Sequence, residues 1–427
     1  MPLLIERAPS RAVTARSARV VRVAIAGCGV VGGELVRLLQ TGAEELERAG
    51  LVFRIVRVLV RDRHKRRTAD LAPHLITTDL DDFVAVDAEL VVEAMGGIEP
   101  AARIVRVALE RGARVVSANK RLLAEQGLEL AELAQRRGGR LDFEAAVGGG
   151  IPIVRAMRES LAGSSPSAIH GILNGTSNYI LTRLHEGASF HEAVSSAQAN
   201  GFAEADPSRD LDGSDTAEKL ALLAWLAHGV APIVRGMRCR GILPDPERLV
   251  RDAESVGGVV RLVASCTRTD SDGRTSASVE PTIVAIDSEL GRCRYEENRI
   301  VVALGWTRPL IFCGPGAGAR PTASAILGDL IAGCAAPLPS ASAPAIHADC
   351  ERHRWLVSVV HGRAAELERA AAGSAFGWTF VDGTGERIRV GPCAWDDVAA
   401  LASRLQSSGA RPVITRLEDG GAGGGLP

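Results

Sequence analysis

The first 150 residues alternate short, continuously apolar runs with segments whose apolar residues recur at helical spacing. Continuous apolar runs are typical of parallel strands that are buried on both faces. Strands are expected within 21–40 (before a glycine-rich turn and a helix) and at 51–60, 88–94, 113–118 and 140–146, with further helices at 101–111 and 121–137. This alternation indicates βαβ units. We therefore predict an α/β domain with a doubly wound parallel sheet over residues 20–150.

The pattern changes near residue 150, where helical and β-rich segments begin to mix. Helices are expected at 152–161, 177–187, 190–199, 214–228 and 246–255, and strands at 167–173, 258–266, 276–286 and 299–304. The mixture predicts an α+β domain over 151–313, with an open sheet suited to substrate binding or dimerisation. Residues 314–334, a glycine-rich turn and a helix, are expected to return to the first domain.

A Pro-, Ala- and Ser-rich stretch at 335–346 is the clearest linker in the chain. The segments after it are expected to be a strand (355–360), a helix (363–372), two strands (376–381 and 386–390), a helix (395–407) and a strand (411–417). This βαββαβ order predicts a small ferredoxin-like unit over 347–418. We expect residues 1–19 to be a flexible extension and 419–427 a disordered tail.

Composition narrows the functional class. The chain has 427 residues and a formal net charge of −1, which gives no reason to expect nucleic acid or an anionic membrane as partner. Its eight cysteines are scattered without metal-site spacing, which favours a reducing compartment. No apolar run approaches the length of about 18 residues that a membrane span needs. We expect a cytoplasmic protein.

A glycine-rich turn joins the first expected strand to its helix. Gly27, Gly29 and Gly32 stand in the pattern G-x-G-x-x-G, with Val30 and Val31 opening the helix. Such glycines allow a tight turn and close approach of a pyrophosphate, which the amides of the helix N-terminus then bind. In this βαβ context the motif predicts a dinucleotide site of the Rossmann type.

The second expected strand ends in the basic run Arg61-Asp62-Arg63-His64-Lys65-Arg66-Arg67. An NAD site usually has an acidic residue here, whereas a basic cluster suits the 2′-phosphate of NADP. NADP is therefore favoured, while Asp62 keeps NAD open. A solvated charged loop explains the run about as well.

Three further segments contain candidate functional residues, and each also has an ordinary structural explanation. Lys120 follows a strand at the sheet edge where open α/β sheets bind ligands, although it could simply be a solvated helix start. The segment 144–152 (EAAVGGGIP) offers a carboxylate and free carbonyls to a hard cation, or is a glycine hinge. The segment 174–179 (NGTSNY) could seat a substrate carboxylate at a helix start, or is a helix cap.

An acidic segment precedes a helix over 214–228. Five carboxylates, Glu204, Asp206, Asp210, Asp212 and Asp215, lie within a dozen positions, and Lys219 follows. The i to i+4 spacing places Asp215 and Lys219 on one helical face. A lysine beside carboxylates could donate a proton or hold a charged substrate; a surface ion pair after an acidic loop is the alternative.

These blocks together resemble the homoserine dehydrogenase family across roughly residues 20–335. The resemblance is carried, in order, by AIAGCGVVG, VVEAMGG, VVSANKRLLA, FEAAVGGGIPI, GILNGTSNYILT, GFAEADPSRDLDGSDTAEKLALLA and GPGAGARPTASAILGDL. It implies reversible reduction of L-aspartate 4-semialdehyde to L-homoserine by NADPH or NADH. A homo-oligomer, either a dimer or a tetramer, is expected.

The resemblance also implies roles for individual residues. Lys219 and Lys120 would transfer the proton, and Glu204 and Asp215 would bind the substrate amino group or position Lys219. Glu204, Asp210, Thr176 and Gly175 would bind substrate. The cofactor would be held by Gly27, Gly29, Val30, Val31, Gly32, Arg61, Gly96, Ser117, Asn119, Lys120, Gly316 and Gly318. A monovalent cation such as sodium would be held by Glu144, Val147, Gly149 and Ile151.

Two departures from the family pattern change the expectations. Phe202 stands where many members have Tyr, so a hydrogen bond from that phenol is missing. The C-terminal unit has the element order of an ACT regulatory domain, but HGRAAELERA replaces the usual Asp-x-Pro-Gly turn. Amino-acid feedback through this ACT-like unit is therefore doubtful. The length leaves no room for an aspartate kinase, so a monofunctional enzyme is expected.

Two rival functions remain. Aspartate-semialdehyde dehydrogenase shares the metabolite but needs a cysteine nucleophile, and no cysteine falls in the catalytic blocks. A nucleotide-sensing regulator with an inactive site would bind cofactor without turnover. The presence of Lys120, Glu204, Asp215 and Lys219 argues against that regulator.

Overall fold

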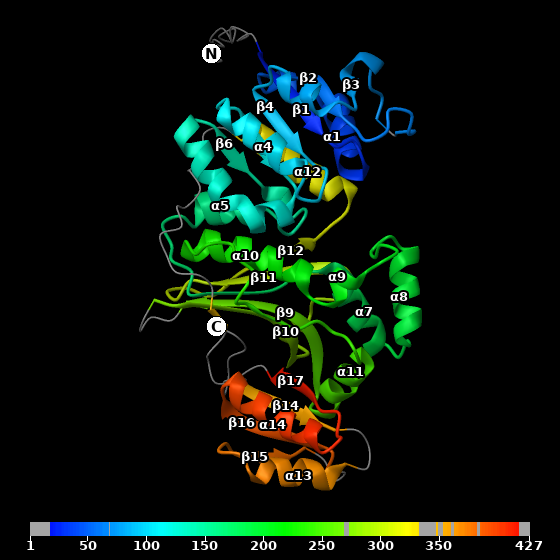
Figure 1. Cartoon of the computed structure of the whole chain (residues 1–427), viewed down its shortest axis with the longest axis vertical. Helices are drawn as coiled ribbons and strands as arrows, with labels where there is room; N and C mark the ends of the chain where they lie inside the picture. Colours follow the sequence, from blue (N-terminus) through cyan, green and yellow to red (C-terminus); the bar gives the residue numbers. More distant parts are fainter. Residues whose placement is uncertain are drawn as a thin grey trace, which may run out of the picture.

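The computed structural model describes residues 18–67, 69–268, 273–332, 347–348, 353–359, 363–381 and 385–417. Three layers follow one another along the long axis of the molecule: a parallel-sheet domain, a large mixed sheet covered by helices, and a small C-terminal unit (Figure 1). The expected extension, linker and tail lie almost wholly outside the described residues. None of the described helices has the length and apolar content that a bilayer crossing requires.

The first domain is built on a parallel sheet in the order β3-β2-β1-β4-β5-β6. The strands are β1 (Arg19–Ala26), β2 (Leu51–Leu59), β3 (Ile76–Thr77), β4 (Leu90–Glu93), β5 (Arg114–Ser117) and β6 (Arg140–Asp142). This is the Rossmann order, with the chain reversing direction across the sheet between β1 and β4. The predicted parallel sheet is therefore confirmed.

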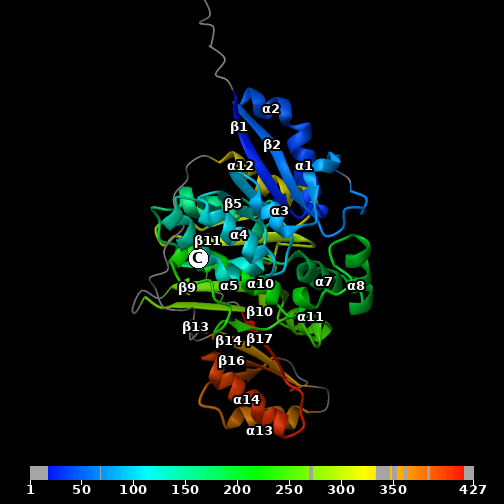
Figure 2. The same ribbon diagram turned by 45° about the horizontal axis from the view of Figure 1, so that its top comes forward.

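Helices cover both faces of this sheet (Figures 1 and 2). They are α1 (Val30–Thr41), α2 (Ala43–Arg48), α3 (Leu80–Ala85), α4 (Ala101–Glu110) and α5 (Lys120–Arg137). α12 (Ala319–Ile331) returns from the far end of the second domain and packs beside α1. Its Ala323, Ile326 and Leu330 are buried in the same apolar cluster as Val23 and Ile25 of β1. Gly314 and Pro315 still belong to β12 of the second domain, and the part of 314–334 that packs on the first domain is α12.

The second domain places helices on one side of a mixed sheet. Its strands are β7 (Ala168–Ile172), β8 (Arg238–Cys239), β9 (Gly258–Arg268), β10 (Thr275–Ala285), β11 (Glu297–Ala303) and β12 (Leu310–Pro315). Its helices are α6 (Ile153–Arg155), α7 (Gly175–His185), α8 (Phe190–Ala199), α9 (Ser208–Leu211), α10 (Ser214–His228) and α11 (Pro246–Ser255). The long strands run β12-β11-β7-β9-β10, and neighbouring strands are antiparallel.

The C-terminal unit continues this sheet. It contains β14 (His353–Ser358), α13 (Ala364–Ala372), β15 (Trp378–Phe380), β16 (Arg387–Cys393), α14 (Trp395–Ser407) and β17 (Val413–Leu417), so the expected βαββαβ order is present. Its strands run β17-β14-β16-β15, and β17 pairs in parallel with β10. A two-residue strand, β13 (His347–Ala348), also pairs with β10. The unit is therefore fastened to the second domain by backbone pairing.

Two expected elements differ from the structure. The predicted strand 140–146 ends at Asp142, and Glu144–Ala146 form a 3₁₀ turn, because the amide of Glu144 donates to Asp329 of α12 (2.9 Å). The predicted helix 152–161 is one α-helical turn, α6, followed by a π-helical turn at Ala156–Ser160. Elements too short or too polar for a periodic signal, such as α2, α3 and β8, were not expected.

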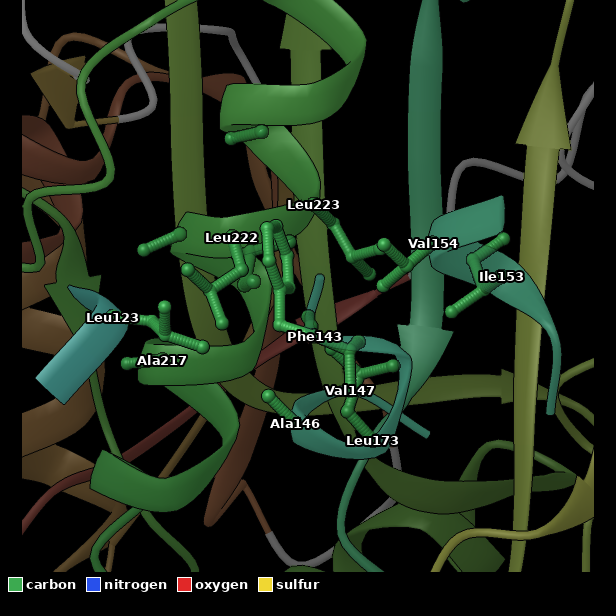
Figure 3. Packing of buried hydrophobic residues seen from close by; sticks show 14 of the residues in the cluster. Leu123, Phe143, Ala146, Val147, Ile153, Val154, Leu173, Ala217, Leu222 and Leu223 are labelled. Atoms are coloured by element: carbon green, nitrogen blue, oxygen red, sulfur yellow. The ribbon is translucent and has the colours of Figure 1, made fainter. Parts of the chain in front are cut away.

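Helix α10 joins the two domains. It lies between α5 of the first domain and strands β9 and β10 of the second (Figure 1), and nearly every one of its residues is buried. Its Leu222 and Leu223 meet Phe143, Val147 and Val154 from the first domain and the hinge (Figure 3). Trp225 is fully buried and stacks on Phe143, with ring centroids 5.8 Å apart.

We expect Trp225→Ala to lower the free energy of unfolding by about 3–5 kcal/mol, because it removes a large buried ring and leaves a cavity. Urea denaturation followed by circular dichroism measures the change. Ile286→Ala is the control, since Ile286 is 53% exposed and its loss should leave the midpoint unchanged. Equal effects of the two substitutions would contradict this account of the core.

Candidate active site

A cavity of about 640 Å³ opens between the first two domains. It collects several predicted site residues from distant parts of the chain: Lys120, Gly149, Gly175, Thr176, Glu204, Asp210, Asp215, Lys219, Gly316 and Gly318. They lie at the starts of α5 and α7, within α9 and the first half of α10, and in the loops that precede α6, α9 and α12. The structure thus brings together residues that the sequence places almost 200 positions apart.

The carboxylate of Asp215 lies at the centre of this group and contacts two ammonium groups. Its Oδ1 is 3.0 Å from Nζ of Lys120, and its Oδ2 is 2.7 Å from Nζ of Lys219. Burial alone would raise the pKa of Asp215, but the charges of Lys219 and Lys120 outweigh burial and hold that pKa well below its usual range. Asp215 therefore stays ionised.

The two lysines differ in their surroundings. Lys219 is 8% exposed and donates a second hydrogen bond to the carbonyl of Leu173 (2.7 Å). An ammonium has three donors, so one N–H of Lys219 remains for the cavity. The charge of Asp215 raises the pKa of Lys120, although burial opposes it.

The choice of lysine at these positions is informative. The chain has three lysines, at 65, 120 and 219, and 47 of its 50 basic residues are arginine. Arginine supplies a positive charge but cannot give up its proton in a protein, whereas lysine can. Two of three lysines in one cavity indicate that the site needs a titratable amine.

Asn174 organises the carboxylates; the sequence placed it in the candidate segment 174–179 but gave it no role of its own. Its side-chain amide donates to Asp210 (2.7 Å) and to Asp215 (2.9 Å), while its oxygen caps α7 by accepting from the amide of Ser177 (2.8 Å). Burial raises the pKa of Asp210, and the nearby charge of Asp215 adds to that rise. The sequence showed only that Asn174 precedes a helix, and an ordinary N-terminal cap explains an Asn at that position equally well.

The predicted substrate residues line the same cavity. Thr176 is buried and donates to the carbonyl of Phe202 (2.5 Å). Phe202 packs against Tyr179, with ring centroids 5.1 Å apart. It therefore presents an apolar ring to the cavity and no hydroxyl group. Glu204 is exposed at the rim, and its carboxylate has no partner among the described residues.

Three of the predicted dinucleotide residues, Lys120, Gly316 and Gly318, line this cavity, whereas the glycines of the turn after β1 lie outside its lining, along the carboxyl edge of the first sheet. Gly27 has φ +96°, and a Cβ there would lie 2.5 Å from the carbonyl oxygen of Ala94, so only glycine fits this turn. Space around Gly29 and Gly96 is open. The edge is therefore free for a ligand beside the N-terminus of α1.

A buried carboxylate holds this edge together. Glu93 ends β4, is 0% exposed, and accepts from Ser117 (2.7 Å), from the Met95 amide (2.9 Å) and from Asn119 (3.4 Å). Asn119 in turn caps α5 by accepting from the amide of Leu122 (3.1 Å). This network positions Lys120, the first residue of α5.

The basic run after β2 is exposed from Arg61 to Arg66. Asp62 accepts from the amide of His64 (2.8 Å), which ties its carboxylate into a local turn. Arg63 donates to the carbonyl of Ile76 (2.8 Å). Arg61 has no partner among the described residues, so its guanidinium is available to a ligand at this edge.

The predicted cation residues surround the hinge between the domains. Both oxygens of Glu144 accept backbone amides, from Val154 and Arg155 (2.8 Å each), and burial together with Asp329 raises the pKa of Glu144 to about 7. The carbonyls of Val147 and Gly149 accept no hydrogen bond from the part of the chain that is described. Carbonyl oxygens of this kind suit a hard cation.

Comparison with known proteins agrees with this geometry. A family model described as homoserine dehydrogenase matches residues 152–331, and one described as the homoserine dehydrogenase NAD binding domain matches 27–144. A homoserine dehydrogenase of Synechocystis is 39% identical over 73% of this chain and 72% of its own length. That of Bacillus subtilis is 35% identical over 74% of this chain and 73% of its own length.

Solved structures show the same likeness. The crystal structure of a homoserine dehydrogenase from Thiobacillus denitrificans has a TM-score of 0.82 at 31% identity, covering 95% of this chain and 100% of that one. A hyperthermophilic archaeal homoserine dehydrogenase in complex with NADPH has a TM-score of 0.62 at 28% identity, covering 73% of this chain and 97% of that one. The chain belongs to the homoserine dehydrogenase family of NAD(P)-dependent oxidoreductases.

Proposed function

We propose that this chain reduces L-aspartate 4-semialdehyde reversibly to L-homoserine, with Lys219 as the proton donor. The observation that carries the assignment of roles is the pair of lysines on the buried carboxylate of Asp215, in a cavity beside the dinucleotide edge. When bound, the nicotinamide cofactor supplies the hydride that reduces the aldehyde carbon.

Residues of the chain stabilise and then protonate the negative charge that this reduction creates. Negative charge develops on the former carbonyl oxygen, which needs a positive group and a proton nearby. Lys219 donates that proton from the N–H that is not bonded to Asp215 or Leu173. Lys120, whose pKa Asp215 raises, stays charged and stabilises the oxyanion. In the oxidation direction neutral Lys219 accepts the proton.

The carboxylates at the rim orient the substrate. Both homoserine and the semialdehyde carry an α-ammonium group, and Glu204 offers it an unpartnered carboxylate. Asp210, held by Asn174, faces the same cavity. Together they would hold the ammonium while Lys219 and Lys120 receive the reacting oxygen.

NADP is the proposed preferred cofactor, with NAD as the alternative. The exposed guanidinium of Arg61 stands at the end of β2, where the adenosine ribose of a bound dinucleotide lies in Rossmann domains. One oxygen of the Asp62 carboxylate already accepts from the amide of His64, which leaves less of its acceptor capacity for ribose hydroxyls. These two features support a 2′-phosphate site.

A monovalent cation such as sodium is proposed at the hinge. The carbonyls of Val147, Gly149 and Ile151 would supply oxygen ligands, and the Ile151 carbonyl also accepts from Ile153 (2.8 Å). The amide of Gly150 donates to the carbonyl of Pro315 (3.0 Å), which holds the two hinge loops together. A cation here would order the loop that precedes α6 and the catalytic cavity wall.

We also propose a homo-oligomer. Strand β12 forms one edge of the described sheet, and Leu310 and Ile311 on it are 36% and 44% exposed, with Trp306 at 73% nearby. An exposed apolar edge strand is a common site of pairing with another chain. A second copy of the chain would cover it.

The rival acyl chemistry lacks its nucleophile, since no cysteine lines the cavity in the described part of the chain. The other rival, a nucleotide-sensing regulator with an inactive site, is tested by measuring turnover.

Oxidation of homoserine, followed at the nicotinamide absorbance with NADP and NAD in parallel, should proceed. Folded, cofactor-bound protein without turnover would leave the regulator as the better account.

We expect Lys219→Ala and Lys219→Arg to lower kcat by about 100-fold or more, the usual scale for a general acid. Lys219→Arg keeps the positive charge but cannot donate a proton, so a loss of activity in this variant shows that proton donation is needed. NADPH binding, measured by fluorescence, should be unchanged in both. The control is Arg121→Ala, beside Lys120 but on the exposed side of α5. Near-normal turnover by Lys219→Arg would exclude this residue as the proton donor.

We expect Arg61→Ala to raise KM for NADP by about tenfold and to leave KM for NAD unchanged, because one charge-assisted hydrogen bond contributes roughly 1.5–3 kcal/mol. The assay is initial-rate kinetics with each cofactor. Arg54→Ala removes the same charge from an exposed position of β2 and should alter neither value. Equal effects on NADP and NAD would speak against a 2′-phosphate contact.

A further inference from the structure

The active-site cavity is richer in carboxylates than in positive groups. Its lining residues with a carboxylate are Glu204, Asp206, Asp210, Asp215 and Glu296. Its positive groups belong to Lys120, Lys219 and Arg209. Both lysines contact Asp215. Arg209 is therefore the one positive group of the described lining that has no task in the proposed reaction.

The substrate brings two charges of its own to this cavity. L-Homoserine and L-aspartate 4-semialdehyde each carry an α-carboxylate beside the α-ammonium group. Glu204 and Asp210 suit the ammonium, but their negative charges would repel the carboxylate. A carboxylate that gives up hydration needs an opposite charge and hydrogen-bond donors in exchange. The α-carboxylate therefore calls for a positive group beside these two residues.

Arg209 has the right position and can be reached by a ligand. It lies on α9, which packs against both α7 and α10 (Figure 1). The next residue along the chain is Asp210, which Asn174 holds at 2.7 Å. The side chain of Arg209 is 50% exposed and lines the cavity. A ligand in the cavity can therefore meet its guanidinium.

Glu218 of α10 anchors that guanidinium. Nη2 of Arg209 donates to Oε1 of Glu218 at 2.5 Å, and Glu218 is only 8% exposed. This hydrogen bond raises the pKa of Arg209, and the charge of Asp215 adds to the rise. A guanidinium has five N–H donors, and those on Nη1 and Nε of Arg209 have no acceptor among the described residues. They remain for a ligand.

Arg209 also lies near the groups that receive the reacting oxygen. Asp215 raises the pKa of Lys120, and the positive charge of Arg209 opposes that rise. In homoserine only three carbon atoms separate the carboxylate from the reacting oxygen, so the groups that bind these two ends have to be neighbours. Arg209 and the lysines meet this requirement.

The start of α7 is the alternative site for the carboxylate, because helix N-termini bind anions. The N-cap residue of α7, Asn174, donates to Asp210 (2.7 Å) and to Asp215 (2.9 Å). A substrate carboxylate at this helix start would thus lie beside two carboxylates of the protein. Like charges at such short range repel, which favours the guanidinium of Arg209.

We propose that Arg209 binds the α-carboxylate of the substrate through the donors that Glu218 leaves free. The inference rests on the proposed function, since it adds one contact to the same substrate. A planar guanidinium matches a carboxylate with two parallel hydrogen bonds. Glu218 holds it in place before the substrate binds. Arg209, together with Glu204 and Asp210, then fixes the end of the substrate that does not react.

Isothermal titration calorimetry with L-homoserine, and with L-homoserinamide as the neutral analogue, tests this contact in the full chain. NADPH is present at saturating concentration, and because it cannot oxidise homoserine, only binding is measured. At about pH 6 the α-amine of both ligands is protonated, so the ligands differ in charge only at the α-carboxyl group. We expect Arg209→Gln to weaken homoserine binding by about tenfold, the effect of one charge-assisted hydrogen bond. Binding of the amide should stay unchanged.

Arg183→Gln is the matched control. Arg183 is likewise held by one glutamate, Glu186 (2.9 Å), but it does not line the cavity. This variant should bind both ligands as the unmodified protein does. If the buried carboxylate of Glu218, left without its partner, unfolds Arg209→Gln, the double variant with Glu218→Gln removes both charges. It should show the same loss for homoserine alone.

The inference is overturned if the folded variant without Arg209 binds homoserine as tightly as the unmodified protein. It is also overturned if homoserine and the amide lose affinity equally, as a purely structural role would cause, or if Arg183→Gln is as damaging. A failure of the proposed function gives a different result. The unmodified protein would then bind neither ligand, and the inference would fall with it.

Discussion

One buried carboxylate shared by two lysines is the interaction on which the site depends. Asp215 and Lys219 begin α10 in the second domain, whereas Lys120 begins α5 in the first. A carboxylate that is fully enclosed is tolerated only when opposite charges and hydrogen bonds compensate for its lost hydration. Asp215 receives two ammonium groups and the amide of Asn174. The ion pair between Asp215 and Lys120 therefore links the two domains at the site.

The packing around α10 makes this arrangement rigid. Trp225 and its apolar neighbours fix the helix between α5 and the large sheet, so the positions of Asp215 and Lys219 follow from core packing and not from the charges themselves. On the other side, Glu93 and Asn119 fix the start of α5 and hence Lys120. Lysine is nearly absent elsewhere in this arginine-rich chain, which is consistent with the proton transfer proposed for these two ammonium groups.

Much of this could be predicted from local signals. Continuous apolar strands and the turn at Gly27 predict a parallel sheet, because both patterns depend on nearby residues alone. The i to i+4 spacing of Asp215 and Lys219 predicts their contact for the same reason, and the structure has it at 2.7 Å. The ion pair with Lys120 could not be derived, since it depends on how two domains pack.

Other features could not be predicted from the sequence, because tertiary contacts override the local pattern. Residues 140–146 alternate polar and apolar side chains as far as Glu144 and were predicted to be one strand, but the amide of Glu144 bonds to the carboxylate of Asp329 on α12 instead of to the sheet. The pairing of β17 with β10 joins residues more than 130 positions apart, and no periodicity indicates it. Asn174 looks like a simple helix cap, and its second role appears only when Asp210 and Asp215 meet it.

The most direct test of the shared carboxylate is the pH profile of kcat/KM for semialdehyde reduction by Asp215→Asn. The negative charge of Asp215 raises the pKa of Lys120, so its removal should let the lysine lose its proton at lower pH. The account predicts that activity falls and that the basic limb of the profile moves to lower pH. An unchanged basic limb, in a variant shown to be folded and to bind NADPH, would contradict the claim that this one carboxylate controls the charge of the site.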